Sequence, residues 1–136
     1  FFPDEQSWRD IQRGMRILNA LSPVDVGQAV VVQQDLVLGI EAIEGTKALL
    51  HRVQSLKRPG PGGVLVKLPK QGQEERIDLP TIGPETIYQA HEAGLRGITI
   101  KAEKTLLLKK EELVTLAENR GLFLAVLDQK QCHELL

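Results

Sequence analysis

The chain has 136 residues, which fits one domain, and its 42% hydrophobic and 26% charged residues indicate a soluble globular protein. A formal net charge of -1 gives no electrostatic case for nucleic-acid binding, because proteins that hold a phosphate backbone usually present a basic face. The single cysteine, Cys132, excludes a disulfide framework, and no apolar run or signal pattern indicates a membrane span or secretion.

The first half of the chain predicts a helix, a β-hairpin and a second helix. Residues 4 to 21 place apolar side chains at helical spacing, and Pro23 follows as a stop signal. Two β-branched runs, 28–33 and 36–40, are separated by a short turn and predict the hairpin. A helix over 46–57 follows, with Thr46 as its expected N-cap.

The second half alternates strands and helices. The pattern predicts strands at 64–68, 97–101, 105–108 and 122–128, and helices at 84–93 and 109–121, with a short or frayed helix after them. Gly94 and Gly121 are the expected C-terminal stops of the two longer helices. The predicted fold class is therefore α/β, a single compact domain over residues 1–136 with a mixed β-sheet flanked by helices.

Two strand–loop–helix units share one local design. "EAIEGT" at 41–46 and "PKQGQEERIDLPTIGP" at 69–84 each follow a strand and enter a helix. A helix N-terminus exposes unpaired N–H groups and partial positive charge, which favour phosphate. Gly45 with Thr46, and Thr81 with Gly83, would allow a ligand to approach the backbone. The alternative is that these are ordinary turns of an α/β fold.

Acidic and basic residues accompany both units. Glu41 and Glu44 flank the first turn, and Asp78 stands between two apolar residues in the second. Carboxylates of this kind suit Mg²⁺ or Mn²⁺, which bind through a few acids together with substrate phosphates. Lys67 and Arg76 could neutralise phosphate charge. The alternative leaves Glu44 as a helix-dipole partner, Glu41, Lys67 and Arg76 as solvated residues, and Asp78 as a turn or capping acid.

Four segments together resemble one known family. They are "DVGQAVVVQQDLVLGIEAIEGT", "GGVLVKLPK", "QEERIDLPTIGPETI" and "AHEAGLRGITI", and with the closing "RGLFLAV" they cover about residues 23 to 127 in order. They are similar to the C-terminal domain of UDP-2,3-diacylglucosamine pyrophosphatase, the two-domain, metal-dependent type of the lipid A pathway. The resemblance implies hydrolysis of UDP-2,3-diacylglucosamine to UMP and 2,3-diacylglucosamine 1-phosphate (lipid X) with a divalent cation, Mg²⁺ or Mn²⁺.

The resemblance also implies roles for individual residues. The family motif Arg-x-Asp-x-Pro-x-x-Gly falls on Arg76, Asp78, Pro80 and Gly83, which makes Asp78 the expected catalytic residue, either as metal ligand or as the base that orients water. We expect Glu41 to be a second metal ligand. The remaining matches comprise the expected phosphate- and substrate-binding residues Gln28, Gly45, Thr46, Lys67, Arg76, Thr81 and Gly83, with Asp25 and Glu44 in support.

Partners and location follow from the same resemblance. Because the chain begins with Phe1 and the family has two domains, we expect a C-terminal piece whose N-terminal domain is absent here. The acylated substrate implies a cytoplasmic protein that associates peripherally with the cytoplasmic face of the inner membrane. The first helix, with Trp8, could contact the absent domain or a second copy in a homo-oligomer. Lys47 and Lys101 depart from the family pattern, and a non-catalytic nucleotide-sugar or lipid-sugar binding or regulatory domain is the alternative function.

Overall fold

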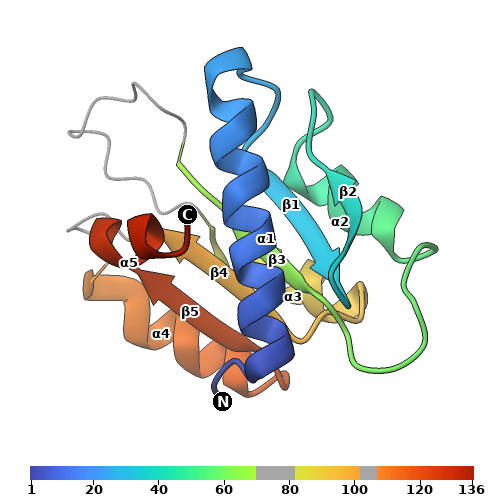
Figure 1. The fold of residues 1–136 in the computed structure, drawn as a ribbon. Helices are drawn as coiled ribbons and strands as arrows, with labels where there is room; N and C mark the ends of the chain where they lie inside the picture. The colour runs from blue at the N-terminus through green and yellow to red at the C-terminus, as the bar shows by residue number, and fades with distance from the viewer. Residues whose placement is uncertain (70–81, 102–106) are drawn as a thin grey trace.

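The computed structural model describes residues 1–69, 82–101 and 107–136 (Figure 1). Its helices and strands, in chain order, are α1 Glu5–Leu21, the 3-10 helix η1 Ser22–Val24, β1 Ala29–Gln33, β2 Leu36–Ile40, α2 Thr46–Val53, β3 Val64–Lys67, α3 Pro84–Glu92, β4 Gly97–Lys101, α4 Leu107–Glu118, β5 Phe123–Leu127 and α5 Gln129–Glu134. The strands form one sheet in the order β2-β1-β3-β4-β5. The predicted α/β class with a mixed sheet is confirmed.

Three details of the sequence prediction are wrong. The apolar run at 107–108 is the first turn of α4 rather than a strand, because a short apolar run does not distinguish a buried strand from a buried helix; residues 105 and 106 lie outside the described part of the chain. Gly45, not Thr46, is the N-cap of α2. This helix ends at Val53, where backbone bonds such as Leu56 N–H to Val53 O tighten the chain into turns.

The strand directions place one end of each of the five strands at the same edge of the sheet. β1 is antiparallel to both β2 and β3, whereas β3, β4 and β5 are parallel. β2 therefore runs in the same direction as the three parallel strands. We call this the C-terminal edge: it carries the ends of β2, β3, β4 and β5 and the start of β1. In open α/β sheets, ligands bind outside the carboxyl ends of the strands.

Side chains of the sheet alternate between two apolar layers. Val30 and Val32 of β1 pack with Ile11, Met15 and Leu18 of α1. Ala29 and Val31 face the other layer, formed by residues of α2, α3 and α4, including Leu49, Leu50, Ile87, Ala90, Leu113 and Ala117. Figure 1 shows α1 and α5 in front of the sheet and α2, α3 and α4 behind it. Within the described residues, no helix has both the length and the apolar character that a membrane crossing requires.

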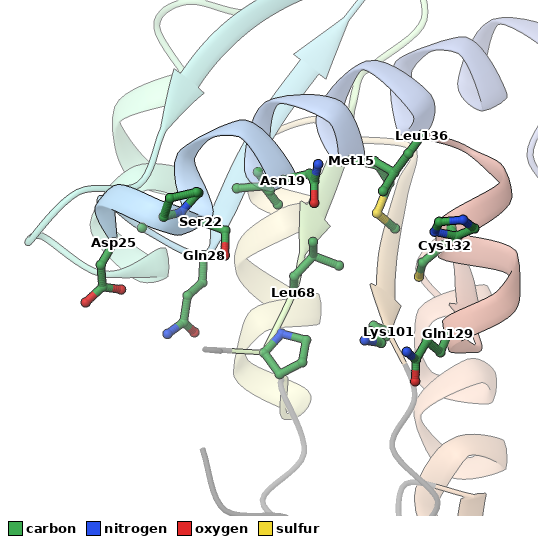
Figure 2. A pocket seen from close by; sticks show the side chains of 15 residues that line it. Met15, Asn19, Ser22, Asp25, Gln28, Leu68, Lys101, Gln129, Cys132 and Leu136 are labelled. Atoms are coloured by element: carbon green, nitrogen blue, oxygen red, sulfur yellow. The ribbon is translucent and has the colours of Figure 1, made fainter. Parts of the chain in front are cut away.

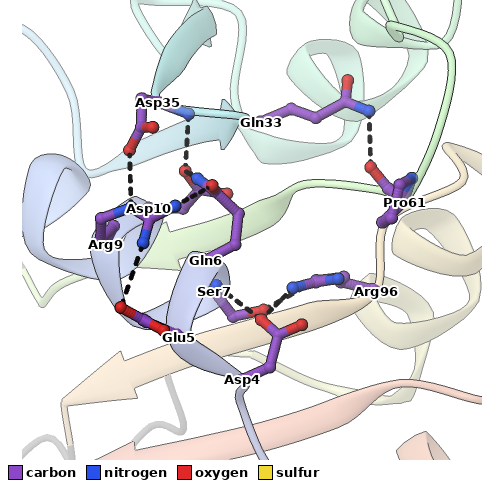
Figure 3. A network of polar contacts seen from close by, with 10 residues as sticks. All are labelled: Asp4, Glu5, Gln6, Ser7, Arg9, Asp10, Gln33, Asp35, Pro61 and Arg96. Atoms are coloured by element: carbon purple, nitrogen blue, oxygen red, sulfur yellow. Dashed lines mark hydrogen bonds and ion pairs between the residues drawn. The ribbon is translucent and has the colours of Figure 1, made fainter.

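A polar network fixes α1 at the edge opposite the C-terminal edge (Figure 3). The buried Asp10 carboxylate accepts a 2.8 Å hydrogen bond from the Asp35 N–H in the β1–β2 turn. The Asp4 carboxylate caps α1 through Ser7 N–H at 2.8 Å and also pairs with the Arg96 guanidinium just before β4. The N-terminal end of α1 is thus tied to two separate parts of the sheet, and its other end points towards the C-terminal edge.

Candidate functional site

Glu41 and Lys67 flank Ala29 on one face of the sheet. Lys67 is the register partner of Ala29 on β3, and on the other side Glu41 donates its backbone N–H to Ala29 O at 2.8 Å. Because paired residues of adjacent strands point to the same face, both long side chains lie on the α2–α3 side, with only a methyl group between them. The backbones of Glu41 and Lys67 lie on either side of β1 and are about 10 Å apart, and the two long side chains can bring their charged ends closer together than that.

The carboxylate of Glu41 is held by Thr46. The Thr46 hydroxyl donates to Glu41 Oε2 at 2.5 Å, and the Glu41 residue is only 9% exposed. The first residue of α2 therefore fixes the acid that ends β2. Both residues were predicted site residues, Glu41 as a metal ligand and Thr46 as an N-cap and phosphate-binding residue. Their hydrogen bond was not predicted, because it depends on how the 41–46 loop closes.

Burial and the charge of Glu41 shift the pKa of Lys67 in opposite directions. Desolvation lowers the pKa of its ammonium below the ordinary value, and the nearby Glu41 carboxylate raises it in part. A half-buried ammonium at the end of a strand is poorly hydrated, so an added anion would compensate for part of its lost solvation. Lys67 thus has the environment expected of a phosphate-binding residue.

Glu44 and Gly45 have structural roles in the first loop, and Asp25 has an unusual backbone outside it. Glu44 pairs with Arg52 at 2.6 Å, and the same guanidinium donates to Ile40 O at 3.2 Å. Gly45 adopts a φ of 88°, a left-handed conformation that other residues rarely take. Asp25 also has a left-handed backbone, with a φ of 50°, directly after η1. These contacts shape the loop and keep the Glu44 carboxylate close to α2.

The second predicted unit is described only at its ends. Arg76, Asp78 and Thr81, together with Pro80, lie outside the described residues. Gly83 is the N-cap of α3, with Pro84 as the first helical residue, and α3 leads back to the start of β4. The N-terminus of α3 therefore lies at the C-terminal edge, on the same side of the sheet as Glu41 and Lys67.

A cavity of about 570 Å³ lies on the other side of the sheet, between α1 and α5 (Figure 2). Gln28 and Asp25 line it, so they share the edge with Glu41 and Lys67 but face the opposite helical layer. Sequence reasoning did not assign this cavity, whose other polar lining residues include Asn19, Ser22, Lys101, Gln129 and His133. The sequence signals on this surface were the predicted site residues Asp25 and Gln28 and the departure from the family pattern at Lys101.

A divalent cation is compatible with the described residues. Among residues 1–69, 82–101 and 107–136, no group of three or more His, Cys, Asp or Glu converges as a complete metal cage would require. Mg²⁺, however, binds through one or two carboxylates, several waters and the phosphates of its substrate. Glu41 suits that mode, since a carboxylate has lone pairs beyond the one that Thr46 uses.

Comparison with known proteins identifies the family. The family model described as the LpxI C-terminal domain matches residues 2–125. The chain belongs to this family. It is also 39% identical over 135 residues to "UDP-2,3-diacylglucosamine pyrophosphatase LpxI" of Caulobacter vibrioides. The resemblance read from the sequence motifs is confirmed.

The two LpxI matches cover different extents. The pairwise match includes 95% of this chain but 48% of the Caulobacter protein, so the chain spans about half the length of that relative. The match to the LpxI C-terminal domain stops within β5, and α5 lies beyond it. Glu41, Thr46, Lys67 and Gly83 are therefore inside the matched range, whereas the α5 wall of the cavity is outside it.

Proposed function

We propose that this chain is the catalytic C-terminal domain of a UDP-2,3-diacylglucosamine pyrophosphatase in lipid A biosynthesis. It would hydrolyse the diphosphate to UMP and 2,3-diacylglucosamine 1-phosphate with Mg²⁺ or Mn²⁺. The observation that carries the proposal is the 39% identity, over nearly the whole chain, to a protein of that name. The arrangement of Glu41, Thr46 and Lys67 at the C-terminal edge supports it.

The described residues suit a diphosphate. Lys67 would offset phosphate charge, and because its ammonium is partly desolvated, the attraction is stronger than for an exposed lysine. No atom of the described part of the chain lies within 4 Å of a Cβ placed on Gly83, and at the first turn of α3 backbone N–H groups without helical partners can donate to phosphate oxygens. Gly45 and Thr46 provide the same opportunity at α2, with Arg76 and Thr81 as further candidates.

Glu41 and Asp78 would hold the cation, which when bound would supply a water of lowered pKa and would neutralise charge on the diphosphate oxygens. Thr46 fixes the Glu41 carboxylate so that it meets the cation without reorganising. Asp78 follows β3 in the chain and precedes α3, between the two elements that carry Lys67 and Gly83. It is the residue that we assign to catalysis, as ligand or as base.

The match to only half of the relative favours two further proposals. In the first, an N-terminal domain completes the enzyme, which works at the cytoplasmic face of the inner membrane. Trp8 on α1 is 39% exposed and would contact that domain or a second copy of the chain. In the second, this half binds a nucleotide-sugar or lipid-sugar without turning it over. Direct assay of the chain with and without the rest of its protein separates these alternatives.

The decisive experiment measures UMP release from UDP-2,3-diacylglucosamine in the presence of Mn²⁺. Asp78→Asn in the full-length protein should reduce turnover by at least about a thousandfold, and EDTA should abolish wild-type turnover. Asp35→Asn makes the same chemical change in the exposed β1–β2 turn at the far edge and should leave UMP release unchanged. Wild-type turnover by Asp78→Asn would refute its catalytic role, and absence of UMP from the wild type would refute the reaction.

A further inference from the structure

The cavity between α1 and α5 has the size and the composition of a ligand site. Its volume of about 570 Å³ lies in the range of pockets that hold small molecules. It lies at the C-terminal edge, where Gln28 precedes β1 and Leu68 follows β3. Its walls come from α1, η1, the strand ends and α5. Binding here would place a ligand directly across the sheet from Lys67 and Glu41.

One wall of the cavity is apolar. Met15, Cys132 and Leu136 are grouped near α5 in Figure 2, and Leu18 and Leu68 line the same cavity. Aliphatic and sulfur-containing side chains adapt to a flexible hydrocarbon chain, whereas a nucleobase is usually held by stacking on an aromatic ring. Among the described lining residues the only ring of that kind is the imidazole of His133. This wall therefore fits an acyl chain better than it fits uracil.

The cavity also has polar lining residues, and one of them is a cation. Lys101 ends β4 and lines the cavity beside Gln129. It is half-buried, and within the described residues no carboxylate forms an ion pair with its ammonium. The side-chain amides of Asn19 and Gln28 add neutral donors. A partly desolvated cation next to an apolar wall is complementary to an amphiphile with an anionic head.

Lys101 is also close to the proposed diphosphate site. β3 and β4 are parallel neighbours in which Lys67 pairs with Ile100, so Lys101 is one residue further along the next strand. Ile100 shares the face of Lys67, and the alternation of side chains therefore directs Lys101 to the α1 face. The two lysines thus lie at adjacent strand ends, one on each side of the sheet, and a diphosphate ester crossing this edge would meet both.

We infer that the cavity between α1 and α5 holds the acylated-sugar end of the substrate, with an acyl chain against Met15, Leu18 and Leu136 and the sugar-side phosphate near Lys101. The inference rests on the proposed function, because it assigns one end of that substrate to a place in the fold. It makes α5, outside the matched range of the family model, part of the substrate site.

Cys132 provides a direct probe, because it is the only cysteine and it lines the cavity. Burial raises the pKa of its thiol, while the charge of Lys101 lowers it, so alkylation should be followed at alkaline pH in the 136-residue chain. Myristoyl lysophosphatidic acid, below its micelle concentration, should slow alkylation by iodoacetamide at least about tenfold at saturation, because it fills the cavity. Glycerol 3-phosphate, which lacks the chain, and UMP, which lacks the acylated sugar, should leave the rate unchanged.

Two variants identify the contacts. Leu136→Glu should raise the lipid concentration for half-protection at least about tenfold, because it places a carboxylate on the acyl wall. Leu56→Glu is the matched control: Leu56 and Leu136 are both 46% exposed, but Leu56 lies outside the cavity lining, so its variant should bind as the wild type does. Lys101→Gln should weaken protection about tenfold, since it removes a charge-assisted contact. Protection is a ratio of rates, which cancels any change in the basal reactivity of Cys132.

The outcomes separate the cavity assignment from the reaction. No protection by the lysophospholipid, equal protection by UMP or glycerol 3-phosphate, or an equal effect of Leu56→Glu and Leu136→Glu would overturn the assignment. In the full-length protein, Leu136→Glu should raise KM for UDP-2,3-diacylglucosamine, and an unchanged KM would count against the cavity even where UMP is formed. Lipid protection without any UMP release would instead support the cavity and refute the hydrolysis.

Discussion

The backbone of Gly27 lies directly against the carbonyl oxygen of Glu41, so close that a Cβ atom at position 27 would sit 1.8 Å from that oxygen. No side chain fits in this gap without moving one of the two loops. Gly27 directly precedes Gln28, whose carbonyl accepts from Leu68 N–H at 2.9 Å, so the same segment is held on its other side by the end of β3. The position of Glu41 therefore depends on a glycine from a different loop.

Gly27→Ala should destabilise the protein and displace Glu41. The clash involves backbone atoms on both sides, and overpacking of this kind costs about 1–3 kcal/mol of the free energy of unfolding. Urea unfolding of the 136-residue chain measures the loss. Gly83→Ala is the control for stability, because a Cβ there meets no atom of the described residues within 4 Å and the backbone φ is -126°. If both alanine variants unfold at the wild-type midpoint, the close approach of the two loops is wrong.

Thr46→Val should lower stability through Glu41. The variant keeps the shape of the side chain but removes the hydroxyl that donates to a carboxylate only 9% exposed. Hydrogen bonds to charged groups contribute about 1.5–3 kcal/mol, so we expect a decrease of that order in the free energy of unfolding at pH 7. Thr46→Ser retains the hydroxyl and should lose less than half as much. Equal losses in the two variants would mean that the methyl group, not the hydrogen bond, supports this loop.

Local patterns were sufficient to predict most of the fold. Gly94 and Gly121 end their helices with φ values of 75° and 74°, as glycine C-caps do, and Gln34 with Asp35 forms the left-handed turn of the hairpin. The error at 107–108 has a physical cause, since a short run of leucines is compatible with both a buried strand and the first turn of a helix. The order of the strands could not be predicted from local sequence patterns, because the pairing of β1 with β3 joins residues far apart in sequence.

The candidate site was predictable in its residue types but not in its contacts. Gly45, Thr46 and Lys67 were named from motifs, and their shared edge follows from the strand directions. The hydrogen bond between Thr46 and Glu41 was not predictable, because it forms only once the 41–46 loop closes. The pairing of Glu44 with Arg52 likewise depends on how the loop meets the helix that follows it. The cavity required the packing of α1 against a helix more than a hundred residues later, which no spacing along the chain indicates.

The Asp4 carboxylate should stabilise the protein in a pH-dependent way through α1 and Arg96. The pKa of Asp4 lies below the ordinary value of 3.8, chiefly because the Ser7 N–H donates to the carboxylate, and Arg96 also lowers it. The folded pKa is depressed, so this contribution is fully present above pH 3.8 and is lost as the pH falls through the lowered value. Asp4→Ala should cost about 1 kcal/mol at pH 7, as the loss of an N-cap does. Asp4→Asn keeps a capping side chain without the charge and should fall between Asp4→Ala and the wild type. Urea unfolding at pH 7 and at acidic pH measures both variants, and a wild-type advantage over Asp4→Asn that persists undiminished in strong acid would contradict a role for the charge.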